Sequence, residues 1–197
     1  MTEFIANIHF QALAEKDPQD VCRRTGCHYN VADACYSLPV WGSTCTIYPH
    51  SSVIHYREQK DQLFHEYFSL FAMHYLLGAK NIEISGKWVS EKDFAGGTTF
   101  FRGPHEIPTH LISQKYLNTV SGFVKRCELL RGGPLDMADA AYCFKITSGI
   151  PVAVLYWAGD EDFPAESKIL YDSTIVEHLA LDIVYALAVG ICHRLAG

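Results

Sequence analysis

Three consecutive acidic residues, Asp160, Glu161 and Asp162, form the part of the sequence best suited to chemistry. They follow residues 151–157, an uncharged apolar run that predicts a strand buried on both faces. Carboxylates at the end of such a strand could bind a hard cation through oxygen ligands, or act as a general acid and base. Their spacing does not match a calcium-binding loop, and Phe163 with a following proline ends the segment at once. A solvent-exposed turn is therefore the ordinary alternative.

Histidines are the second set of candidates, with ten in the chain and no HExxH motif. His74 lies between Leu70 and Leu77 in an apolar stripe, where a neutral imidazole must find a partner. A hydrogen-bonded core histidine is the ordinary explanation. The more specific alternative is an axial ligand to a metal or tetrapyrrole. His28 is the second candidate ligand, and Tyr67 could contact the face of a macrocycle.

A glycine-rich segment, residues 96–99, closely precedes Arg102. Its backbone N–H groups could hold an anion, and the guanidinium could pair with a carboxylate or a phosphate. The segment lacks the GxGxxG and GxxxxGK[ST] patterns, so a plain connection between strand and helix is the simpler interpretation. Because its guanidinium could still pair with an anionic group, Arg102 is kept as a candidate cofactor-binding residue.

The seven cysteines form no CxxC pair, so the strong signature of a zinc or iron–sulfur site is missing. An odd number of cysteines favours reduced thiols over a disulfide framework. Four of them lie between Cys22 and Cys45, a dense local set. Small core residues explain this set better than a metal site does.

Length, composition and charge restrict the class of protein. A chain of 197 residues with 49% hydrophobic residues fits one globular domain, residues 1–197. The net charge of −6 and the scattered basic residues argue against a nucleic-acid partner. We expect no membrane span, because uncharged apolar runs of about 20 residues are missing. The first residues lack the pattern of a secretory signal, which predicts a cytoplasmic location.

Apolar periodicity and turn residues predict an α+β fold, a single domain with a mostly antiparallel sheet and long helices packed on it. In the first half, Asp17 and Gly26 have the residue types that begin and end a short helix. The clearest helix covers residues 59–78 and should lie across a sheet. The other elements expected there are a helix at 4–16, a meander at 34–55 and a strand at 82–89.

In the second half, an apolar stripe predicts one long helix from Pro108 to Gly132. Asp172 should accept backbone N–H bonds where a strand turns toward the last helix. The other elements expected there are a loop at 94–99, strands at 142–146, 151–157 and 168–171, and a helix at 179–195.

Two segments resemble the domain-of-unknown-function 3786 family of anaerobic bacteria and archaea. Residues 159–165 are similar to its GDEEFP-type loop, with Asp162 in place of the usual Glu. Residues 168–173 are similar to its ILFD-type strand, with Tyr171 in place of the usual Phe. Residues 24–26, 88–90 and 96–97 also look similar, so the resemblance spans about 10–195.

The resemblance implies a domain type without implying a reaction. Family members are sometimes joined to, or found beside, iron–sulfur and corrinoid-dependent methyl-transfer proteins, which implies service to a redox or tetrapyrrole cofactor. Cys27, Cys35 and Cys45 do not belong to the family pattern.

The leading hypothesis is a non-enzymatic cofactor-binding or accessory module for a corrinoid or haem-type tetrapyrrole in anaerobic metabolism. Its small-molecule cofactor would bind near His74, His28, Tyr67 and Arg102, and an iron–sulfur or corrinoid protein would be the partner. The alternative is a metal-assisted hydrolase that uses the loop of Asp160, Glu161 and Asp162 with a nearby histidine.

Overall fold

The computed structural model describes residues 5–56 and 64–197, and its strands form two antiparallel sheets. The first sheet has the order β1-β2-β3-β4 and the second the order β5-β9-β8-β7-β6. The α+β class and the antiparallel pairing are confirmed, although the strands form two sheets instead of one. The strands are β1 His28–Asn30, β2 Cys35–Val40, β3 Ser43–Tyr48, β4 Val53–Tyr56, β5 Trp88–Val89, β6 Gly133–Leu135, β7 Ala140–Thr147, β8 Ile150–Trp157 and β9 Glu166–Asp172.

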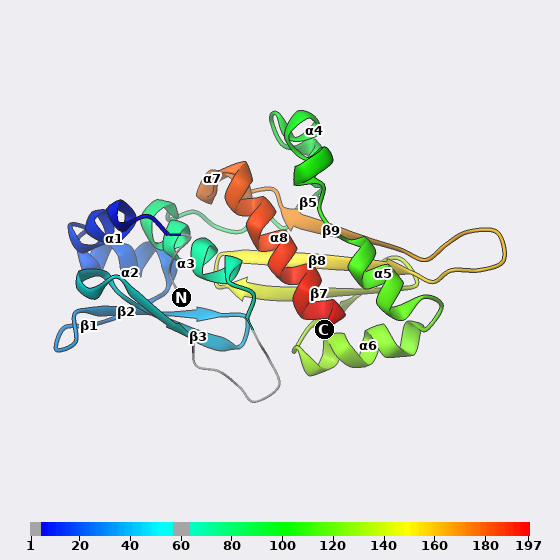
Figure 1. Cartoon of the computed structure of the whole chain (residues 1–197), viewed down its shortest axis with the longest axis horizontal. Coiled ribbons are helices and arrows are strands. Elements are labelled where there is room, and N and C mark those ends of the chain that lie inside the picture. Colours follow the sequence, from blue (N-terminus) through cyan, green and yellow to red (C-terminus); the bar gives the residue numbers. More distant parts are fainter. Residues whose placement is uncertain (1–4, 57–63) are drawn as a thin grey trace.

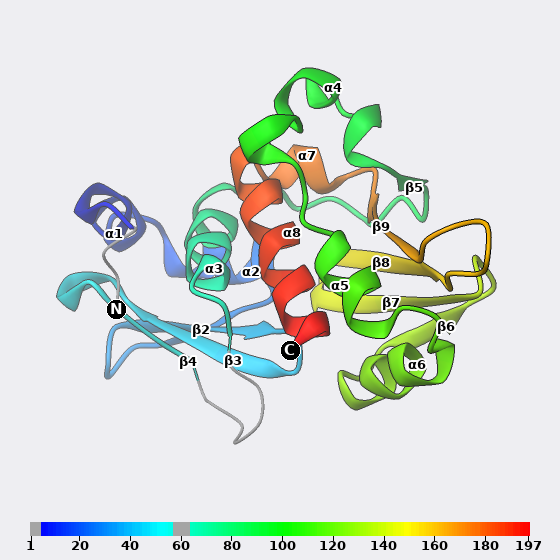
Figure 2. The same cartoon turned by 45° about the vertical axis from the view of Figure 1, so that its right-hand side comes forward.

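The longest helix, α8, crosses over β7 and β8, and α3 lies beside it above the first sheet (Figure 1 and Figure 2). Side chains from α3, α8 and both sheets form one continuous buried cluster. The helices are α1 Asn7–Ala14, α2 Pro18–Thr25, α3 Tyr67–Gly78, α4 Gly97–Phe100, α5 His110–Tyr116, α6 Val120–Leu129, α7 Ile175–His178 and α8 Leu181–Ala196, with short 3-10 turns η1 Pro49–Ser51, η2 Glu91–Asp93 and η3 Gly103–His105. None of the helices in the described part of the chain has the length and apolar character needed to cross a membrane.

The ends of α2 follow the local sequence as predicted. The Asp17 side chain accepts the Gln19 N–H at 3.1 Å at the N-terminus, and Gly26 adopts φ +69° at the C-terminus. The helix expected at residues 59–78 is α3, which begins at Tyr67. Residues 59–63 of that prediction lie outside the described residues.

The prediction of a single long helix from Pro108 is wrong, because the helix is interrupted at Leu117 and forms two helices, α5 and α6. Leu117 has φ +50°, and its carbonyl accepts the Tyr156 hydroxyl and, at 3.2 Å, the Gly159 N–H. Apolar side chains continue across the break, since Tyr116 and Phe123 remain in ring contact at 5.7 Å. The apolar stripe is therefore uninterrupted although the helix is not.

The strand expected at residues 82–89 reduces to the two residues of β5. The backbone just before β5 pairs with the side chain of Asp172 instead of with a strand, and Asp172 is only 2% exposed. Its carboxylate accepts the N–H groups of Ser85 at 3.1 Å and Gly86 at 2.7 Å, and that of Thr174 at 3.0 Å. Asp172 thus accepts backbone N–H groups at the end of its strand, as predicted. It also accepts them from Ser85 and Gly86, which lie outside this turn.

The two sheets meet at a corner centred on Trp41. Its backbone N–H donates to the Ile146 carbonyl at 2.8 Å, which joins the end of β2 to β7. The indole N–H donates to the Leu130 carbonyl at 3.2 Å. Arg194, 4% exposed, donates to the Trp41 carbonyl at 3.2 Å and lies over the indole ring at 4.8 Å.

Candidate functional site

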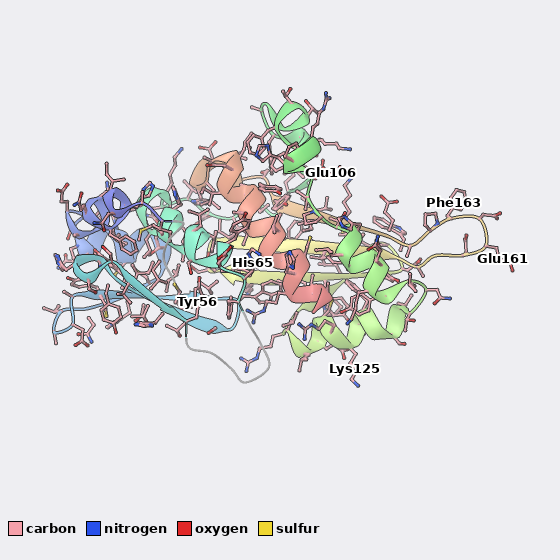
Figure 3. All side chains as sticks on the ribbon, viewed as in Figure 1. Tyr56, His65, Glu106, Lys125, Glu161 and Phe163 are labelled. Atoms are coloured by element: carbon pink, nitrogen blue, oxygen red, sulfur yellow. The ribbon has the colours of Figure 1, made fainter. Side chains whose placement is uncertain are left out.

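A cleft of about 570 Å³ opens between the segment that joins β5 to α5 and strand β9. This segment, with α4, projects from the body of the protein in Figure 1, and Glu106 within it is labelled in Figure 3. Most of the lining residues are charged or polar. The charged ones are Glu91, Lys92, Arg102, Glu106, Glu166 and Lys168.

Tight local packing builds the wall of the cleft. The Ser90 N–H and hydroxyl donate to Asp93 at 2.7 and 2.8 Å, which fixes η2, and these hydrogen bonds lower the pKa of Asp93. Gly97 then passes so close to η2 that a Cβ there would lie 2.0 Å from the Glu91 carbonyl oxygen. The loop expected at residues 94–99 is thus partly wrong, because Gly97 begins α4. Close approach of two backbone segments explains the glycine at this position.

The outer side of the same wall is attached to α8. The Phe100 ring stacks on His105 at 4.6 Å, and His105 meets the edge of Tyr185 at 5.4 Å. The Tyr185 hydroxyl also donates to the Pro104 carbonyl at 3.0 Å. The projecting segment is therefore held by the helix behind it, which keeps the wall in place.

The floor of the cleft combines a hydrogen bond with apolar side chains. Ser167 is 5% exposed and donates its hydroxyl to the Thr109 carbonyl at 2.6 Å, which ties β9 to the start of α5. Phe101 and Ile169 are buried at 7% and 1% exposure, and both line the cleft. A bound molecule would find charged groups at the rim and apolar carbon below.

Three of the rim residues, Lys92, Arg102 and Lys168, are cations. In residues 5–56 and 64–197, the ion pairs within 4 Å join Asp20 to two arginines of α2 and Lys80 to Glu177, so none joins two residues of the cleft. The guanidinium of Arg102 presents five donors in a plane, a geometry that matches a carboxylate or phosphate. The cleft can therefore offer its cations to a ligand.

Of the other predicted cofactor-binding residues, His74 and Tyr67 share one face of α3, two turns apart. The His74 ring is half-buried and lies 4.7 Å from the ring of His9. Burial lowers the pKa of His74, His9 lowers it further, and Asp182 acts in the opposite direction. The lowered pKa favours the neutral imidazole, which is the form that binds a metal.

The structure does not bring all four predicted cofactor-binding residues into one site. Arg102 lies at the cleft, His74 and Tyr67 lie on α3, and His28 is exposed at the start of the edge strand β1. The Tyr67 ring contacts His65 at 4.6 Å. His28 and Arg102 thus occupy elements different from the helix that carries His74.

The acidic loop forms a turn at the tip of the β8–β9 hairpin, where Glu161 and Phe163 point outward (Figure 3). Asp160, Glu161 and Asp162 are all exposed. The Asp160 carboxylate accepts the N–H groups of Asp162 at 2.9 Å and Phe163 at 2.8 Å, as the turn interpretation requires. In the part of the chain that the structure describes, no group of three or more His, Cys, Asp and Glu side chains could hold a metal ion. The metal assignment to this loop stays a prediction.

Arg102 was predicted from the sequence, whereas Lys92 and Lys168, its companions at the cleft, were not. The two lysines belong to η2 and β9, which come together only through the fold. No motif or spacing in the sequence connects them.

The chain belongs to the family described as Domain of unknown function (DUF3786), which matches residues 17–194 of the 197. The match confirms the resemblance of the segments around Asp160 and Lys168, and its range includes every residue that lines the cleft. Comparisons with curated proteins and with solved structures give no match.

Proposed function

We propose that the protein is a non-enzymatic ligand-binding or accessory module, and that its cleft binds a small polar molecule with a carboxylate or phosphate group. The cations at the rim, free of ion pairs with the cleft's own carboxylates among the described residues, carry the proposal. The volume of about 570 Å³ lies within the range of small-molecule sites, roughly 300–1,000 Å³.

Arg102 is the anchor in this proposal, because its planar fork forms two parallel hydrogen bonds to one anionic group. Lys92 and Lys168 add positive charge from the two sides of the cleft. Glu91, Glu106 and Glu166 accept hydrogen bonds, so the ligand also carries donors such as hydroxyl, amide or ammonium groups.

A tetrapyrrole held by His74 is the second candidate. The half-buried imidazole of His74 supports it, because its pKa is lowered, His9 is in ring contact and Tyr67 lies on the same face of α3. The family resemblance favours a corrinoid or haem in anaerobic metabolism, with an iron–sulfur or corrinoid protein as partner. The polar rim around Arg102 suits a macrocycle less well than it suits a small anion.

Binding measurements on the full chain separate the two candidates. For the cleft, the probes are inorganic phosphate, glycerol phosphate and succinate. Isothermal titration calorimetry measures the binding of each one. Arg102→Ala should weaken binding by about 10- to 100-fold, on the scale of hydrogen bonds to a charged group. The affinity of Arg102→Lys should fall between those of the wild type and Arg102→Ala. Lys125→Ala is the surface control, because Lys125 is an exposed residue of α6 outside the cleft.

For the second candidate, haemin and hydroxocobalamin are titrated and followed by absorption. A saturable band shift that His74→Ala removes, with an unchanged circular dichroism spectrum, would support ligation. The cleft proposal is refuted if none of its three probes binds, or if Arg102→Ala binds as well as Lys125→Ala. The tetrapyrrole candidate is refuted if neither compound shifts its band.

A further inference from the structure

Two cysteines meet at the C-terminal end of α2. Gly26, in the left-handed conformation at φ +69°, ends the helix, and its N–H donates to the Cys22 carbonyl at 2.9 Å. This turn carries Cys27 back over the last turn of the helix. The Cys27 thiol consequently points at Cys22 Sγ, with the two sulfur atoms 3.5 Å apart.

The two thiols differ in their access to solvent. Cys27 is buried at 8% exposure, and burial raises the pKa of its thiol to about 12. Cys22 is half-buried and therefore partly accessible. Cys143, also half-buried, lies on β7 in a different part of the fold and provides a single-thiol reference.

We propose that Cys22 and Cys27 form a redox-active dithiol, which a low-molecular-weight disulfide such as oxidised glutathione converts to an intramolecular disulfide. The sulfur atoms must approach from 3.5 Å to a bond length of about 2.05 Å. Side-chain rotation at the open end of a helix can supply this movement without unfolding α2.

The reaction proceeds in two exchange steps. The Cys22 thiolate attacks one sulfur of the oxidant, so that the oxidant's S–S bond breaks, a mixed disulfide forms and one glutathione thiolate leaves. Cys27 then attacks the Cys22 sulfur, and the second glutathione leaves with the proton of the Cys27 thiol. The protein loses two thiols, and one small disulfide is reduced to two thiols. The accessible Cys22 reacts first because the protonated, buried Cys27 is a poor nucleophile.

The dithiol is adjacent to a contact between α2 and α3. Arg24, between the two cysteines in sequence, donates to the carbonyls of Ala79 and, at 3.4 Å, Leu76 at the end of α3. The redox state of the pair would therefore act on the turn that holds this end of α3, the helix that carries His74.

Peptide mapping of the full chain tests the proposal. The reduced, folded protein is incubated with oxidised glutathione, free thiols are alkylated, and the protein is digested with trypsin. Trypsin cuts after Arg23 and Arg24, so Cys22 and Cys27 fall on different peptides unless a disulfide joins them. The second peptide, residues 25–57, also carries Cys35 and Cys45, so fragmentation of the joined peptides assigns the link. We expect a Cys22–Cys27 link in the wild type and in Cys143→Ser, and a trapped glutathione adduct at Cys22 in Cys27→Ser.

Recovery of Cys22 and Cys27 as alkylated free thiols from the incubated wild type would overturn the proposal. It would also fail if the link formed only in denaturant, where the fold no longer places the sulfur atoms together. Absence of the Cys22 adduct in a Cys27→Ser protein with a native circular dichroism spectrum would refute the order of the two steps and with it the proposed dithiol.

Discussion

Asp172 offers the sharpest test of how a single side chain organises the fold. Its buried carboxylate accepts hydrogen bonds from three backbone N–H groups and from the hydroxyls of Ser85 and Thr174. Replacing it with asparagine keeps the shape and removes the charge, whereas replacing it with alanine removes every acceptor at once.

The expected loss of unfolding free energy can be obtained in two ways. Burial acts to raise the pKa of Asp172, but hydrogen bonds from Thr174 and Ser85 outweigh it and lower the pKa from 3.8 to about 2. At about 1.36 kcal/mol per pKa unit, this lowering corresponds to about 2 kcal/mol of stability. Hydrogen bonds to a charged group contribute about 1.5–3 kcal/mol each and do not add fully. We therefore expect a loss of about 2 kcal/mol for Asp172→Asn and about 3 kcal/mol for Asp172→Ala at pH 7.

The pH dependence follows from the sign of the shift. A carboxyl whose pKa is lowered on folding stabilises the protein above its unfolded pKa, and this contribution is lost as pH falls through the folded value. The difference in unfolding free energy between wild type and Asp172→Asn should therefore be full above about pH 5 and shrink toward pH 2.

Urea unfolding followed by circular dichroism, at pH 7 and at steps down to pH 3, measures this difference. Asp136→Asn is the matched control, since Asp136 is exposed and should change stability little. The reasoning is refuted if Asp172→Asn unfolds like Asp136→Asn at pH 7, or if its deficit does not change with pH.

Two further substitutions test buried positions near the cleft. The Tyr171 hydroxyl is fully buried and has no hydrogen-bond partner among the described residues, so Tyr171→Phe should raise the unfolding free energy by about 1–2 kcal/mol in urea unfolding. A decrease instead would mean that the hydroxyl bonds to an ordered water. Gly97→Ala should destabilise by about 1–3 kcal/mol in the same assay, because its Cβ would overlap the Glu91 carbonyl, whereas Gly133→Ala has open space and should be nearly neutral. Equal stability of these two glycine variants would contradict the packing described for the cleft wall.

Local signals in the sequence were sufficient for several elements. Asp17, Pro18 and Gly26 determine the ends of α2, since capping and left-handed backbone depend on the residue itself. Alternation and turn residues likewise predicted β2, β3, β7, β8 and β9, but not β1 or β6. The sequence Asp-Ser-Thr at the end of β9 predicted that Asp172 accepts backbone N–H groups.

Features that depend on distant residues were not predictable. The break at Leu117 is held by groups of Tyr156 and Gly159, which the pattern between Pro108 and Gly132 does not contain. The corner at Trp41 joins the two sheets through a bond to Ile146, and the cleft lies between two segments that only the fold brings together. Arg102 could be selected from its own chemistry, but its neighbours could not.

The corner at Trp41 also has a consequence for synthesis on the ribosome. Its bonds come from residues spread along the chain, and Arg194 follows Trp41 by 153 positions. The first sheet is synthesised early but lacks this support until Arg194 has been translated. Contacts of such long sequence separation slow folding and leave early segments exposed meanwhile. During translation the strands of the first sheet are therefore exposed before the residues that support the corner have been made, which favours aggregation.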